Sequence, residues 1–194
     1  SEEIVVATID TGASIDHPDL VDKIFNKPLE IPGNGLDDDN NGFIDDVNGW
    51  DFVDDDAKPN DLTGHGTAVS GIAGARGNNG IGGSGVGWNI KILPLKVGDS
   101  GGLSSSAIAE SLTYVSKMWN LGIKVVATNN SYGSTAPNDI ARSEIQTHED
   151  LGIVFVAAAG NSGEDIDAPG NSQFPAGFPE SNVISVANST QGDE

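Results

Sequence analysis

The sequence predicts an α/β fold in which a parallel sheet carries helices on both faces, giving three layers. Two observations predict it. Short apolar runs rich in β-branched residues alternate along the chain with longer segments of helical periodicity, the pattern of parallel strands joined by crossover helices. The apolar runs are also nearly continuous, as expected for strands buried on both faces. The length of 194 residues suits a single domain, 1–194.

Each element follows from local pattern. The predicted strands are residues 4–9, 90–95, 123–127, 153–159 and 183–186. The predicted helices are residues 64–75, 104–120 and 139–150. The first helix is rich in small residues, which favours close packing, and Thr63 is a plausible cap for it. The second begins after serines, repeats apolar residues at helical spacing and is stopped by Gly122.

Residues 32–62 interrupt this alternation. The segment is long, polar and rich in Asp, Asn and Gly, so we interpret it as an acidic insertion within the single domain. The chain as a whole carries 29 acidic against 9 basic residues, a formal charge of −20. Such a surface repels nucleic acid and anionic membranes. Cysteine is absent, which excludes thiolate chemistry, and no run of about 20 apolar residues spans a membrane.

The stretch Asp10-Thr11-Gly12 raises a question of function. Asp-Thr-Gly surrounds each carboxylate of an aspartic protease dyad, and Asp99-Ser100-Gly101 could supply a second copy. The same region, "VGDSGG", also matches the nucleophile motif of chymotrypsin-like proteases. Both of those classes are built from β-structure, whereas this chain reads as α/β. We therefore interpret Asp99 and Ser100 as loop residues.

Asp10 and His65 form the better candidate pair. Asp10 stands at the carboxyl end of the first strand, where open parallel sheets form their sites. His65 begins a predicted helix and is flanked by glycines. A neutral imidazole acts as a general base when a buried carboxylate fixes its tautomer. A single histidine in a helix is more often structural, but the glycines leave room for another segment to approach.

Four motifs together resemble the subtilases, the subtilisin-like serine proteases: "VATIDTGASIDHPDL", "GHGTAVSGIAG", "NNSYG" and "FVAAAGNSG". They occur in the family's chain order and cover nearly the whole chain. By this resemblance Asp10 is the triad aspartate and His65 the triad histidine, with the nucleophilic serine expected later in the chain. Asn161 resembles the asparagine whose side-chain amide donates to the oxyanion.

The resemblance also implies a substrate groove. An extended peptide would lie between two edges as an added strand, and small residues would leave space for a sizeable apolar P1 side chain. The implied groove residues are Gly101, Gly102, Leu103, Ser131, Tyr132, Gly133, Ala158 and Gly160.

The family's nucleophile motif, "GTS-M-A", does not occur in the 194 residues. We therefore expect the chain to be the N-terminal portion of a catalytic domain, inactive alone because the base has no serine to activate. An exposed apolar sheet face is expected to recruit the C-terminal part or a second copy. The family implies a secreted endopeptidase that cleaves peptides or proteins. The alternative is a non-enzymatic calcium-binding pseudoprotease or peptide-binding scaffold.

The insertion contains "DDDNNGFIDD", which resembles the first half of an EF-hand loop. Closely spaced carboxylates repel one another unless a cation binds, so we predict a Ca²⁺ site here. The Glu expected at position twelve is replaced by Asn48, and Asp46 is an alternative closing ligand. The candidate ligands are Asp37, Asp39, Asn41, Phe43, Asp45 and Asp46.

A second Ca²⁺ site is implied by the resemblance alone. The "HPDL" motif supplies Asp19, and the "GNNGIGG" loop supplies the side chain of Asn79 with the carbonyls of Gly77, Ile81 and Gly83. Neither His17 nor His148 is assigned a role; we expect His148 to be solvated at a polar helix end.

Overall fold

The computed structural model describes residues 3–189 and 192. Its central sheet has the order β2-β3-β1-β6-β7-β8, and all five neighbouring pairs are parallel. The strands are β1 Ile4–Asp10, β2 Trp50–Asp51, β3 Ile90–Lys96, β6 Val125–Asn130, β7 Val154–Ala158 and β8 Val183–Val186. A separate antiparallel hairpin, β4 Gly98–Asp99 with β5 Gly102–Leu103, follows β3.

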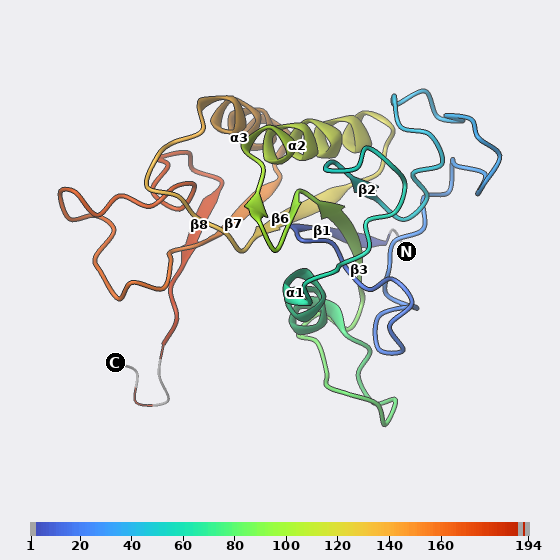
Figure 1. Ribbon diagram of the computed structural model, residues 1–194, viewed down its shortest axis with the longest axis horizontal. Coiled ribbons are helices and arrows are strands. Elements are labelled where there is room, and N and C mark those ends of the chain that lie inside the picture. Colours follow the sequence, from blue (N-terminus) through green and yellow to red (C-terminus); the bar gives the residue numbers. More distant parts are fainter. Residues whose placement is uncertain (1–2, 190–191, 193–194) are drawn as a thin grey trace.

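The helices cover both faces of the sheet, as predicted (Figure 1). The helices α2, Ser105–Asn120, and α3, Asp139–Leu151, lie side by side on one face. The shorter helix α1, His65–Gly74, lies on the opposite face against β1 and β3. The α/β class and the three-layer arrangement are therefore confirmed. The main core is formed where α2 and α3 pack on the sheet, around residues such as Leu112, Ile145 and Phe155.

Most predicted boundaries shift by one to three residues, and two of these shifts have a clear local cause. The strand expected at 123–127 begins at Val125, because the amide of Ile123 still bonds the helical carbonyl of Met118. It then continues to Asn130, which pairs with Ile9 of β1. Helix α1 begins at His65 with Gly64 in the cap position, at φ 90° and with no side-chain cap bond. Thr63 is therefore not its N-cap.

The acidic insertion is mostly irregular, and a buried ion cluster fastens it to α2. Lys27, only 1% exposed, lies 2.8 Å from Asp39 and also contacts Asp46. The hydroxyl of Tyr114, on α2, donates to Asp46 at 2.6 Å, and burial together with the Asp46 charge raises the pKa of Tyr114 well above its usual value. Lys117 donates to the Asn41 carbonyl at 2.8 Å. Removing Lys27 would leave both carboxylates without their buried cation, and breaking a buried ion pair in this way costs about 3–5 kcal/mol.

One face of the sheet remains partly open. Helix α1 covers β1 and β3, while apolar side chains of the neighbouring strands stay exposed: Val126 at 39%, Ile184 at 51% and Val186 at 49%. Along the described residues, no helix combines the length and apolar character needed to cross a membrane.

His148 is fully buried, so the expectation of a solvated side chain is wrong. It lies on the face of α3 that packs against α2, and its Nε2 lies 2.9 Å from the Leu112 carbonyl. A carbonyl can only accept, so Nε2 carries the proton. Burial lowers the pKa of His148, and the bond to Leu112 offsets this only in part. The sequence around His148 is polar and gave no sign of burial, because α3 buries only a narrow face formed by Ala141, Ile145 and His148.

The lowered pKa predicts a pH-dependent stability. The unfolded chain takes up a proton at His148 near the ordinary value of about 6.5, whereas the folded chain resists until lower pH. The contribution to stability is therefore complete above that value and is lost as the pH falls below it. We expect His148→Gln to flatten the decline in urea midpoint between about pH 7.5 and 5.5. His17→Gln, at an exposed position, is the control, and an unchanged decline in His148→Gln would contradict the assignment.

Candidate active site

The carboxyl ends of the parallel strands place the candidate residues along one edge of the sheet. The register pairs Asp10 of β1 with Lys96 of β3, and Ile9 with Asn130 of β6. Asp10 itself is 1% exposed. The segments that follow β6 and β7 leave the sheet at the same edge, as expected for parallel strands. The topology thus gathers residues that are up to 150 positions apart in the chain.

Asp10 and His65 are in direct contact. His65 Nδ1 lies 2.6 Å from Asp10 Oδ1, which also accepts the amide of Thr11 at 2.7 Å. An ionised carboxylate can only accept, so in the neutral imidazole Nδ1 carries the proton and Nε2 is a bare acceptor. The His65 side chain is 57% exposed, and no described residue makes a hydrogen bond to its Nε2. The pair therefore presents a base toward solvent.

Two glycines allow this contact. A Cβ on Gly66 would lie 2.1 Å from the Gly12 carbonyl oxygen and 3.2 Å from Asp10 Oδ1, so only glycine lets α1 come this close to β1. Gly12 has φ 97°, and a Cβ there would lie 2.4 Å from the Pro59 carbonyl. The turn that follows Asp10 therefore fills the space that Gly66 leaves open beside His65.

Asp99 plays no part in a carboxylate dyad. It lies exposed in the β4–β5 hairpin, where its carboxylate accepts the amide of Gly101 at 2.8 Å. Ser100 is a turn residue, as interpreted, whereas Asp99 ends the two-residue strand β4. Gly101, Gly102 and Leu103 complete the hairpin just before α2.

The segment Ser131-Tyr132-Gly133 follows directly from β6. The Tyr132 hydroxyl donates to Asn130 Oδ1 at 3.0 Å, and the amide group of Asn130 donates to the Val156 carbonyl of β7 at 3.1 Å. Burial, and next the charge of Asp10, raise the pKa of Tyr132. Ala158 ends β7, and Asn161 lies exposed in the loop beyond it.

Sequence reasoning missed Gln173. Its side chain lies against both Gly133 and Gly160: a Cβ on Gly133 would be 3.1 Å from Gln173 Oε1, and one on Gly160 would be 3.7 Å from Gln173 Cδ. The polar amide of Gln173 therefore occupies the space beside both Gly133 and Gly160. No motif marks it, because it lies in an irregular loop far along the chain.

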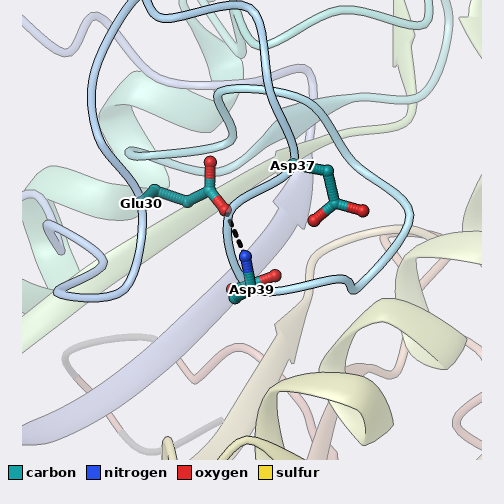
Figure 2. Close-up of side chains that lie close together, drawn as sticks. All are labelled: Glu30, Asp37 and Asp39. Atoms are coloured by element: carbon teal, nitrogen blue, oxygen red, sulfur yellow. Dashed lines mark hydrogen bonds between the residues drawn. The ribbon is translucent and has the colours of Figure 1, made fainter.

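Three carboxylates converge, two from the insertion and one from Glu30 just before it (Figure 2). Oxygens of Glu30, Asp37 and Asp39 lie within 4.8 Å of one another. Glu30 is 6% exposed; its Oε1 accepts the amides of Asp38 and Asp39, while its Oε2 is buried without a hydrogen-bond partner among the described residues. Burial raises the pKa of Glu30, with neighbouring carboxylates adding to the rise. Clustered hard oxygen donors suit Ca²⁺, and Glu30 had been missed because it precedes the motif.

Other predicted ligands of this loop lie differently. Asp45 accepts the amides of Asn34 and Gly35, each at 3.0 Å. Asp46 is turned inward to Lys27 and Tyr114. Contrary to expectation, these two carboxylates do not belong to the cluster of Glu30, Asp37 and Asp39. Each instead binds hydrogen-bond donors or a cation elsewhere in the fold. Asn41 uses its side chain to bond Asp46 and the Phe43 amide.

The second predicted cation site is assembled as a hydrogen-bonded loop. Asn79 donates to Asp19 Oδ1 at 2.7 Å, and the amide of Gly83 donates to Asp19 Oδ2 at 3.1 Å. The Asn79 side-chain oxygen accepts the amide of Ile81. Gly77 packs under the ring of Trp88. Asp19 therefore lies against this loop.

A buried carboxylate that orients an exposed imidazole, at the carboxyl edge of a parallel sheet, is an arrangement suited to acyl-transfer enzymes. The chain belongs to the subtilase family, whose model matches residues 1–194. It is 35% identical over 189 residues to thermitase of Thermoactinomyces vulgaris, covering 97% of this chain and 56% of thermitase. It is also 35% identical over 201 residues to subtilisin-like protease 1 of Plasmodium falciparum, covering 97% of this chain and 28% of that protein.

Solved structures agree. The S41 psychrophilic protease superposes with a TM-score of 0.74 at 28% identity, over 98% of this chain and 56% of that one. Sphericase gives 0.71 at 27% identity, over 99% and 56%. The chain thus spans about half the length of thermitase and of both these structures.

The close approach of α1 predicts a sharp effect of one methyl group. Gly66→Ala must push α1 away from the Asp10 turn, and overpacking of this kind costs about 1–3 kcal/mol. Gly71→Ala is the matched control, because it lies in the same helix with open space around it and should stabilise by up to about 1 kcal/mol. Urea unfolding measures both, and equal effects at the two glycines would contradict the packing described.

Proposed function

We propose that this chain is the base-bearing part of a serine endopeptidase of the subtilase family. The hydrogen bond between Asp10 and His65 is the observation that carries the proposal. A bare Nε2 on an oriented imidazole is what a serine hydroxyl needs in order to lose its proton during attack on a peptide carbonyl. Membership of the subtilase family and a subtilisin-like protease among the relatives support the proposal.

In this mechanism His65 Nε2 takes the proton of the attacking serine and later gives it to the leaving amine. Asp10 keeps its charge and stabilises the imidazolium. Asn161 donates to the oxygen that becomes negative in the tetrahedral intermediate. The nucleophilic serine belongs to a segment outside these 194 residues, a proposal supported by the greater length of the relatives and by the lack of any described serine bonded to His65. The chain alone is then inactive.

The substrate is a peptide or protein segment bound in extended form between the hairpin residues Gly102 and Leu103 and the segment Ser131 to Gly133. The Gln173 amide between Gly133 and Gly160 makes the P1 side chain's surroundings more polar than the small residues alone suggest. The open sheet face around Val126 and Ile184 is where the remainder of the catalytic domain, or a second copy, would pack.

We also propose Ca²⁺ as a stabilising ion, held by Glu30, Asp37 and Asp39, with Asn41 and Phe43 nearby. When bound, the ion neutralises mutual repulsion of the carboxylates and fixes the insertion. The Asp19 loop, with Asn79 and the carbonyls of Gly77, Ile81 and Gly83, is the second proposed site. Secretion is proposed because one relative, 29% identical over 195 residues, is an extracellular serine protease of Natrialba magadii, of which the match covers 31%.

The competing proposal is a calcium-binding scaffold that holds peptides without cleaving them. A fluorophosphonate reagent separates the two. We expect it to label the full-length natural protein at a serine beyond Glu194, to lose that labelling in His65→Ala, and to leave the 194-residue chain unlabelled. Labelling of a serine within the chain, or labelling indifferent to His65, would contradict the enzymatic proposal. A full-length protein that binds peptide but takes no label would favour the scaffold.

Calcium should raise the stability of the chain. Ligand at 100 times its dissociation constant adds about 2.7 kcal/mol, which corresponds to a rise in Tm on the order of 5–10 °C for a domain of this size. Glu30→Gln keeps the oxygen that accepts backbone amides but removes the charge, so we expect it to lose the part of this rise that the insertion site contributes, while the second proposed site keeps its part. Glu110→Gln, at an exposed position on α2, should keep it. An equal calcium effect in all three proteins would exclude Glu30 as a ligand.

A further inference from the structure

Asp61 is a half-buried carboxylate that precedes α1 and accepts an unusual number of hydrogen bonds. Its Oδ1 accepts the amides of Thr63 and Gly64 at 2.8 and 2.9 Å. Its Oδ2 accepts the amide and the hydroxyl of Thr67 at 2.9 and 2.7 Å. The first amides of a helix have no partner within the helix. The N-cap residue Gly64 has no side chain to accept them, so the Asp61 carboxylate does this from three residues earlier.

The same carboxylate reaches the strand that carries Asp10. The Thr11 hydroxyl donates to Asp61 Oδ1 at 2.9 Å and accepts both the amide of Gly66 at 3.0 Å and the hydroxyl of Thr63 at 2.8 Å. Thr11 is 7% exposed, so water competes little for these bonds. One hydroxyl therefore joins the residue after Asp10 to the residue after His65.

Backbone bonds reinforce the junction. Ala13 donates to the Pro59 carbonyl at 2.9 Å, Asp61 donates to the Ala13 carbonyl at 3.3 Å, and the Ser14 amide donates to the Thr67 hydroxyl at 3.0 Å. The end of β1 and the start of α1 are thus joined on both sides of the Asp10 and His65 contact. Displacing either segment would lengthen that contact directly.

A simple helix cap differs from this arrangement. Asn138 caps α3 through its side-chain oxygen, which accepts the amide of Ala141, and its side-chain NH₂ donates to the Ser105 carbonyl. Asp61 instead joins the start of α1, which carries His65, to Thr11, the residue that follows Asp10. Burial alone would raise the pKa of Asp61, but the bonds from Thr67, Thr63 and Gly64 outweigh it and hold the pKa far below its usual value, so the carboxylate is ionised near neutral pH.

We propose that Asp61 is a positioning residue that acts through Thr11 to hold the Asp10 carboxylate and the His65 imidazole at hydrogen-bonding distance. This inference rests on the proposed function, because it assigns Asp61 to the same base. Asp61 touches neither substrate nor the reacting atoms. It fixes two backbone segments, and a misplacement of about 1 Å at a reacting group can cost on the order of 100-fold in rate.

The test follows the His65 Nδ1 proton by NMR in the 194-residue chain at low temperature. A proton held between imidazole and carboxylate is shifted far downfield and exchanges slowly with water. Asp61→Asn places an amide NH₂ against backbone donors, and Thr11→Val removes the linking hydroxyl. We expect both to lose the signal, and Thr11→Ser, which keeps the hydroxyl, to retain it. In the full-length protease, Asp61→Asn and Thr11→Val should lower kcat on the order of 10- to 100-fold with little change in KM.

Two controls separate positioning from general stability and charge. Asn138→Ala removes a cap from α3, and Asp165→Asn removes an acidic charge from an exposed turn where it accepts the Asp167 amide. Both should keep the signal, whatever their effect on Tm. A signal that survives in Asp61→Asn and Thr11→Val would overturn the inference alone. A wild-type chain that lacks the signal would instead overturn the Asp10 and His65 assignment on which it rests. If Asp61→Asn fails to fold, the Thr11 pair decides.

Discussion

The hydrogen bond between Asp10 and His65 is the contact on which the site depends. It joins residues 55 positions apart across 2.6 Å. Asp10 Oδ2 is buried and has no hydrogen-bond partner among the described residues, so the carboxylate is stabilised through Oδ1, by the Thr11 amide and the imidazole. His65 is therefore the only side chain that the described residues offer to the negative charge of Asp10 as a hydrogen-bond partner. A buried charge with so few partners is costly, which is why the surrounding backbone must be fixed by other bonds.

Charge compensation is the second constraint. With a formal charge of −20, the chain has few cations to distribute, and it buries two of them. Lys27 neutralises Asp39 and Asp46 beneath the insertion, and Lys96 lies 2.5 Å from Asp51 on β2. Glu30 and Asp37 have no ion pair with Lys27, and their carboxylates converge beside Asp39. A divalent cation there would complete a compensation that Lys27 provides only in part.

Much of this arrangement could be predicted from the sequence. Continuous apolar runs gave the parallel strands, and the motifs around Asp10 and His65 identified the pair, because a strand end and a helix start are read from local pattern. The fates of Asp45, Asp46 and His148 could not be predicted. Each depends on which way a side chain turns in tertiary context: Asp46 toward Lys27, His148 toward Leu112. Glu30, Asp61 and Gln173 lie outside any motif and are placed by loops.

Neutron diffraction from crystals of the chain in heavy water near neutral pH tests the central claim most directly, since it locates the protons of the pair. If Asp10 orients His65 as a base, the neutral imidazole carries its deuteron on Nδ1, directed at Asp10 Oδ1, and Nε2 is bare. A deuteron on Nε2 with Nδ1 bare, or a deuteron on the Asp10 carboxylate, would contradict the account.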